Sequence, residues 1–178
     1  MNSNLKNLTR AAFLLAIAII FQLIGRTFPG IGQILVGPAV NAILILTATI
    51  CGLWLGVAVG ILTPLLAWIL GQLAAPLAPF IPFIIIGNLI FVILYYNFTK
   101  INKYGDIIGI IIGALFKFLF LFLSATKIVI ALKLFTNPKI IKTLSVAMGA
   151  LQLITAIVGG VIALLLLKLL KNKILINS

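Results

Sequence analysis

Apolar residues dominate the chain in long runs, and the few polar positions between them divide it into segments of membrane-spanning length. An α-helix needs about 20 apolar residues to cross the hydrocarbon core of a bilayer. The pattern predicts six such helices, over residues 8–25, 39–54, 56–71, 83–98, 106–126 and 144–167. We therefore expect an all-α integral membrane protein, a six-transmembrane-helix bundle that forms one domain over residues 1–178 and has both termini in the cytoplasm.

Glycine and proline set the expected breaks between these helices. Residues 26–38 are rich in both yet still apolar, which favours a loop that folds back towards the membrane. A hairpin turn is expected within residues 52–56, and three prolines in residues 72–82 argue against a regular helix there. Residues 127–143 are half apolar and carry four lysines, so this segment is either a mobile gate or an interfacial helix.

Composition and charge exclude most catalytic and metal-binding functions. The chain is 64% hydrophobic and only 8% charged, with 13 Lys and Arg, a single acidic residue (Asp106) and no histidine. Soluble domains are about half apolar and about a quarter charged, so the membrane interpretation holds. Without histidine or paired carboxylates we expect no catalytic residues, no metal site, no cofactor and no nucleic-acid partner. Cys51 lies in an apolar run and is expected to be a small core residue.

Polar side chains inside the spans are the candidate binding residues, because polar groups are costly in lipid. Amides, a tryptophan and cations gather in the outer halves of the predicted helices. The candidate substrate-binding residues are Gln33, Asn41, Trp68, Gln72, Asn88, Lys117, Ser124, Lys127 and Gln152. Gln22 belongs to the same outer group. The group resembles a small-molecule pocket. The alternative is that these side chains join helices by hydrogen bonds.

Lys117 is the most informative of these positions. It lies eleven residues after Asp106, near the middle of the membrane. One interpretation is that Lys117 or Lys127 meets an anionic group of a ligand, such as a carboxylate. The alternative is that Lys117 bonds to backbone carbonyls or reaches the membrane interface.

Small residues recur at four-residue spacing in several spans. Ala12 and Ala16 form an AxxxA pattern, and Gly105, Gly109 and Gly113 form a GxxxGxxxG pattern. Such patterns allow close approach of helices, either within one chain or to a partner protein. The tyrosines at 95, 96 and 104 flank the loop after the fourth span and are expected to be interfacial anchors.

The chain resembles the substrate-binding S components of energy-coupling factor (ECF) transporters, which import vitamins and related micronutrients into prokaryotic cells. The resemblance rests on the length, the six spans, the excess of basic residues and the absence of a GxxxxGK[ST] phosphate-binding loop. It also rests on the stretches LTRAAFLLAIAIIFQ, GPAVNAILILTATICGLWLGVAVGILTPLLAWILG and PFIPFIIIGN.

The resemblance implies a location in the cell membrane and assembly with other protein subunits. Ala12 and Ala16 would dock on a transmembrane coupling subunit that carries two ATPases, and residues 26–38 would form a lid over the substrate. The chain would bind a vitamin or micronutrient at the outer face and topple in the membrane to release it. The competing hypothesis is a stand-alone facilitator, channel or membrane-assembly protein.

Overall fold

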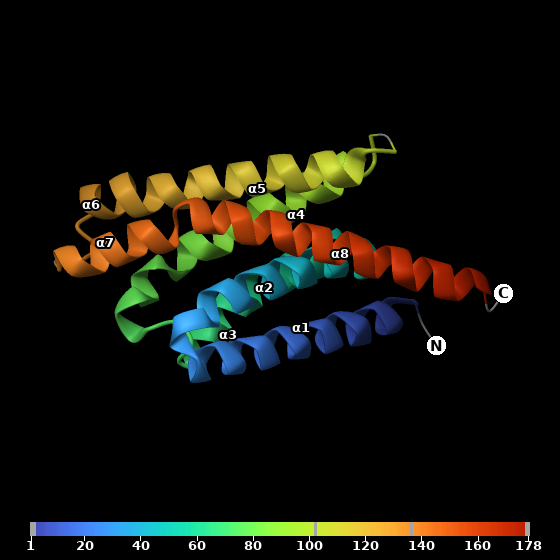
Figure 1. Ribbon diagram of the computed structural model, residues 1–178, viewed down its shortest axis with the longest axis horizontal. Coiled ribbons are helices and arrows are strands. Elements are labelled where there is room, and N and C mark those ends of the chain that lie inside the picture. The colour runs from blue at the N-terminus through green and yellow to red at the C-terminus, as the bar shows by residue number, and fades with distance from the viewer. Residues whose placement is uncertain (1–2, 102, 136, 177–178) are drawn as a thin grey trace.

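The computed structural model describes residues 3–101, 103–135 and 137–176, apart from the side chains of residues 29–31, 33 and 172–176. The chain forms an elongated helical bundle with both termini at one end (Figure 1). The long helices are α1 (Ser3–Thr27), α2 (Pro29–Cys51), α3 (Leu53–Ile69), α4 (Ile81–Phe98), α5 (Gly105–Leu123) and α8 (Ala150–Ile176). Among the described residues, five helical segments are long and apolar enough to cross a membrane, and α3 is a shorter apolar helix of 17 residues. The predicted all-α, six-helix membrane fold is confirmed.

The end of the bundle opposite the termini is built from short elements. A 3-10 helix, η1 (Ala75–Phe80), precedes α4, and a π-helical turn, η2 (Ser124–Ile128), extends α5 into α6 (Val129–Ala131). The helix α7 (Pro138–Ala147) begins where the Asn137 side chain accepts the Lys139 backbone N–H at 2.9 Å. In α7 Leu144 is buried while Lys139 and Lys142 are exposed, which is the arrangement of an interfacial helix.

The prediction of a loop over residues 26–38 is wrong. Helix α1 continues to Thr27 and α2 begins at Pro29, so Phe28 alone separates them. The glycines serve helix contact here: a methyl group on Gly32 would overlap the Gly25 carbonyl oxygen of the neighbouring helix. Proline is well tolerated at the first turn of a helix, and Pro38 lies inside α2. The described backbone of residues 26–38 is therefore helical on both sides of Phe28 and does not form the expected lid loop.

The break between α2 and α3 is a single glycine. Gly52 has φ +99° and ψ 165°, a backbone conformation that is essentially restricted to glycine. Gly56 has a different role, because a methyl group there would lie 2.9 Å from the Ala48 Cβ atom. The chain thus turns at Gly52, while Gly56 lets α3 pack closely on α2.

The GxxxGxxxG pattern of α5 faces the inside of the bundle. A methyl group on Gly109 would lie 3.0 Å from the Tyr95 carbonyl oxygen, and one on Gly113 would lie 3.1 Å from that of Phe91. This pattern therefore brings α5 against α4 and serves packing within the chain.

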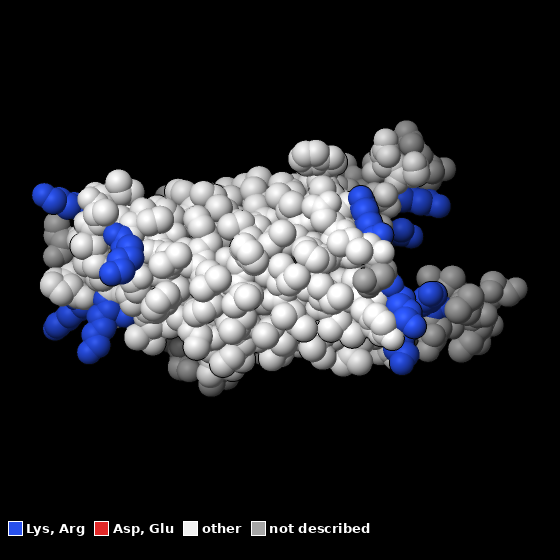
Figure 2. Space-filling model, turned by 90° about the horizontal axis from the view of Figure 1, so that it is seen from above, with Lys and Arg blue, Asp and Glu red and all other residues white. Residues whose placement is uncertain are grey.

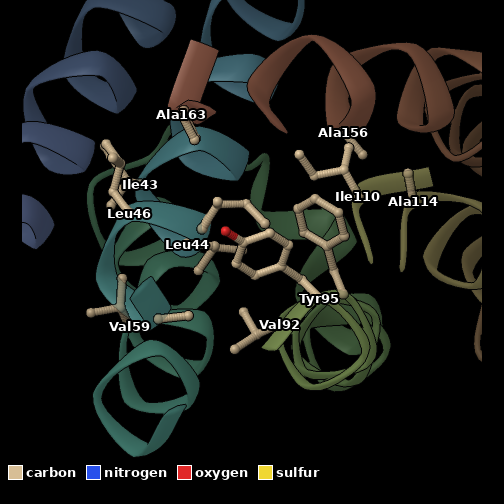
Figure 3. Close-up of a cluster of buried hydrophobic side chains, with 14 of the residues drawn as sticks. Ile43, Leu44, Leu46, Val59, Val92, Tyr95, Ile110, Ala114, Ala156 and Ala163 are labelled. Atoms are coloured by element: carbon tan, nitrogen blue, oxygen red, sulfur yellow. The ribbon is translucent and has the colours of Figure 1, made fainter. Parts of the chain in front are cut away.

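The main hydrophobic core lies between α2, α4, α5 and α8. Figure 3 shows Tyr95 projecting from α4 towards Leu44 of α2, with Val92 beside it. Tyr95 is only 1% exposed, and its hydroxyl bonds to Thr49 Oγ1 at 3.0 Å and donates to Asp106 Oδ1 at 3.3 Å. The prediction that Tyr95 is an interfacial anchor is wrong, because its hydroxyl finds polar partners inside the bundle.

Candidate functional site

Lys117 lies inside the bundle and joins three helices. Its Nζ atom, on α5, donates to Asn41 Oδ1 of α2 at 2.6 Å and to Asn88 Oδ1 of α4 at 2.9 Å. The Phe91 ring centroid lies 5.4 Å from Nζ. Lys117 and Asn88 are each 3% exposed and Asn41 is 2% exposed. The structure thus brings together three predicted site residues that are far apart in the sequence.

Asn88 also compensates for a proline in the neighbouring helix. Pro64 lies inside α3 and has no N–H, so the carbonyl of Gly60, four residues earlier, loses its usual donor. Asn88 Nδ2 donates to that Gly60 oxygen at 3.0 Å. Gly60 lies directly against α4, since a methyl group there would meet Asn88 Cβ at 3.5 Å, an ordinary van der Waals contact. One amide side chain therefore supports both Lys117 and the interrupted α3.

A second polar pair lies next to this one and involves α1. Gln22 Nε2 donates to the Thr63 carbonyl oxygen at 3.0 Å, one residue before Pro64. Within the described part of the chain, Gln22 Oε1 and Thr63 Oγ1 are buried without a hydrogen-bond partner. We call Gln22, Asn41, Thr63, Asn88 and Lys117 the polar cluster; its members come from α1, α2, α3, α4 and α5.

No acidic side chain lies beside Lys117 in the described part of the chain. Asp106 is the single acidic side chain of the sequence, and it lies eleven residues away on the same helix, about 16 Å by helical rise. Figure 2 shows Lys and Arg at both ends of the molecule, with a band between them on the visible face that carries none. Lys117 is buried, so its neighbours are two amide oxygens and an aromatic ring.

The other predicted site residues lie apart from this contact. Ser124 is fully buried in the π-helical turn, and its Oγ finds no hydrogen-bond partner among the described residues. Trp68 and Lys127 are exposed, and Gln72 and Gln152 are half-buried. Gln33 lies on α2, and its side chain falls outside the described residues.

Sequence reasoning missed the residues of α3 that complete the cluster. Gly60, Thr63 and Pro64 contribute backbone carbonyls and a missing N–H rather than polar side chains. The available signal was Pro64 itself, because a proline within a span leaves an unpaired carbonyl four residues earlier. Arg26, the first residue of the expected loop, lies instead in the last turn of α1. Its Nη1 donates to the Leu70 carbonyl oxygen at 2.9 Å and so joins the ends of α1 and α3.

One face of α1 is left uncovered. Ala12 and Ala16 are exposed, whereas Ala11, Ala18 and Gln22 on the opposite side of the helix are buried against the bundle. The exposed face therefore offers small side chains to whatever lies beside α1 in the membrane.

These features define the class of protein: a multi-pass helical membrane protein with a polar cluster sealed inside an apolar bundle. A family model described as the ECF transporter substrate-specific component matches residues 6–171, and the chain belongs to this family. No curated protein and no solved structure matches the chain significantly. The protein is thus a transporter subunit of the prokaryotic plasma membrane and not an enzyme; its family associates with an ECF module and binds a small-molecule substrate.

Proposed function

We propose that this chain captures a vitamin or related micronutrient near the polar cluster and delivers it through an ATP-driven coupling module. The observation that carries the proposal is Lys117, a lysine buried in a membrane bundle with two amide oxygens as its hydrogen-bond acceptors. Ionisable residues inside membranes are costly, and by default they mark functional sites.

The same geometry favours a substrate with an anionic group. An ammonium group has three N–H donors, and the two amides take two of them. A buried charge is most stable beside an opposite charge, which the chain itself does not supply near Lys117. A substrate carboxylate would supply it. Since Lys117 is 3% exposed, such binding requires the surrounding helices to open locally.

Ala12 and Ala16 are proposed as the contact with the coupling subunit. Their exposure on α1 allows another helix to approach the backbone closely. The sequence has no phosphate-binding loop of the GxxxxGK[ST] type, so ATP hydrolysis would be performed by partner subunits. The chain would then topple in the membrane to release its substrate.

Substrate capture is tested by purifying the full chain and identifying bound small molecules by mass spectrometry. We expect one acidic compound to be retained by the wild type and lost from Lys117→Met. Asn41→Asp is a second variant, which keeps the acceptor for Lys117 but adds the missing negative charge and so competes with an anionic substrate. The control is Lys100→Met, which changes an exposed lysine just after the C-terminal end of α4. Equal retention by all four proteins would refute the proposed site.

Docking is tested with the double variant Ala12→Leu, Ala16→Leu. We expect it to lose association with the coupling subunit and to keep substrate binding, because the added side chains separate the helices. The matched control is Ala131→Leu with Ala150→Leu, which changes two exposed alanines elsewhere on the molecule. Normal association of the first double variant would remove Ala12 and Ala16 from the interface.

One observation favours the second candidate function, a stand-alone facilitator or assembly protein whose polar residues are structural. Asn88 bonds both to Lys117 and to the carbonyl that Pro64 leaves open, so part of the polar cluster stabilises helix packing. The two functions differ in whether the isolated chain moves the captured compound across a membrane without a coupling module.

A further inference from the structure

A groove of about 740 Å³ lies between α1 and α8 at the end of the molecule that holds the termini. Its floor and walls are apolar and include Phe13, Leu14, Leu167 and Leu170. Its volume is in the range of small-molecule sites, about 300 to 1,000 Å³. Along α1 the groove ends at Leu14, about two helical turns before Gln22 of the polar cluster, and α8 contributes no residue to that cluster.

Two cations border this groove. Arg10 of α1 and Lys171 of α8 both line it, and both are exposed. The single acidic side chain of the sequence, Asp106, accepts a hydrogen bond from Tyr95 in another part of the bundle. No acidic side chain of this chain is therefore left to neutralise Arg10 and Lys171, and their counter-charge has to come from another molecule.

A second groove lies on the other side of α8 and likewise combines an apolar lining with a basic side chain. It has a volume of about 400 Å³, lies between α5 and α8, and is apolar apart from Lys168. Lys168 and Lys171 are thus neighbours on the last turns of α8 that border different grooves. A cation beside an apolar groove recurs on both flanks of one helix, which matches a molecule with an anionic head and an apolar tail.

We propose that the groove between α1 and α8 binds an anionic phospholipid. The phosphate lies between Arg10 and Lys171, and an acyl chain lies along Phe13, Leu14 and Leu170. Basic sites between transmembrane helices bind lipid head groups in this way, and each cation near an anionic membrane surface strengthens the attraction. The lipid occupies the leaflet on the side of the termini and fills the space between α1 and α8, beside the exposed Ala12 and Ala16.

The proposal is tested by native mass spectrometry of the delipidated full chain, titrated with phosphatidylglycerol or phosphatidylcholine of identical acyl chains. We expect phosphatidylglycerol to bind more tightly to the wild type. The variant Arg10→Gln, Lys171→Gln should lower that affinity about 30-fold, about fivefold per cation, and remove the preference between the two lipids. The charge-matched control is Lys100→Gln, Lys103→Gln, which changes two exposed lysines in the loop after α4 and should bind as the wild type does.

A second pair of variants tests the apolar part of the groove without a change of charge. Leu170→Trp narrows the groove and should weaken phosphatidylglycerol binding, whereas Leu169→Trp, at the neighbouring exposed position outside the groove, should not. Equal binding of the two lipids by the wild type, or equal loss in both charge variants, would overturn the proposal. If the groove variants bind lipid normally but fail to bind the coupling subunit, the groove is a protein contact and the proposal is wrong.

Discussion

Asn88 should stabilise the bundle through two hydrogen bonds, one of them to the carbonyl that Pro64 leaves without a donor. The perturbation is Asn88→Leu, which is similar in size but removes both the bond to Gly60 O at 3.0 Å and the bond from Lys117 Nζ at 2.9 Å. Interhelical hydrogen bonds in bilayers contribute about 0.6 kcal/mol on average and up to about 1.7. The loss of two should lower the free energy of unfolding by about 1 to 3 kcal/mol.

A double-mutant cycle separates the two bonds. Pro64→Ala restores an N–H that donates to Gly60 O within α3, so the amide of Asn88 is no longer needed there. In the Pro64→Ala background, Asn88→Leu should therefore destabilise the protein by about 1 kcal/mol less than in the wild type. Reversible unfolding in mixed detergent and SDS micelles measures all four proteins.

The control for this cycle is Asn97→Leu. Asn97 lies on the same helix, but its Nδ2 donates to the Ile93 carbonyl oxygen within α4. Its replacement should cost the same in both backgrounds. If Asn88→Leu also costs the same with and without the Pro64→Ala substitution, the carbonyl of Gly60 does not depend on Asn88 and the reasoning fails.

Substitutions at three further positions, Gly109, Gly52 and Tyr95, test how the bundle is held together, and each is measured in the same unfolding assay. Gly109→Leu should lower the free energy of unfolding by about 1 to 3 kcal/mol because the new side chain meets the Tyr95 backbone. The control Ile107→Leu, at an exposed position, should leave it unchanged. An equally stable Gly109→Leu variant would contradict the close contact of α4 with α5. Gly52→Ala and Gly52→Asn should each lower the free energy of unfolding by about 1 to 3 kcal/mol, because the observed backbone angles are as unfavourable for Asn as for Ala. If Gly52→Asn were as stable as the wild type, the turn would have a different backbone conformation. Tyr95→Phe should cost about 1 kcal/mol because it loses the hydroxyl's bonds to Thr49 and Asp106. Tyr96→Phe keeps the ring beneath Lys100 and should cost little. Equal effects of the two variants would mean that the hydrogen bonds of Tyr95 do not stabilise the protein.

The helical membrane fold was predictable because the spans are long and apolar, and the break near Gly52 was predictable because glycine stands there in an uncharged stretch. The continuous helices over residues 26–38 were not predictable from composition. Glycine favours loops in water, but in a bundle Gly25 and Gly32 allow two helices to touch. The same local residues thus support opposite structures, and the tertiary contact decides between them.

The candidate site was predictable only as a set of costly polar residues. The sequence singled out Asn41, Asn88 and Lys117 because each is expensive to bury, and the bundle does bring them within hydrogen-bond distance. Their partners in α3 are backbone atoms, which carry no polar signal in the sequence. The sequence also does not show which small-residue face is exposed. Ala12 and Gly109 belong to similar four-residue patterns, but Ala12 lies on an open surface and Gly109 on a packed one.

The proposed function requires that this chain captures a substrate but needs a coupling module and ATP to move it. The most direct measurement is uptake into proteoliposomes of the compound identified by mass spectrometry, with the chain alone and with the coupling and ATPase subunits. We predict accumulation above the external concentration only when the module and ATP are both present, and none with the Ala12→Leu, Ala16→Leu variant. Equilibration of the compound by the chain alone would contradict the account and identify a facilitator.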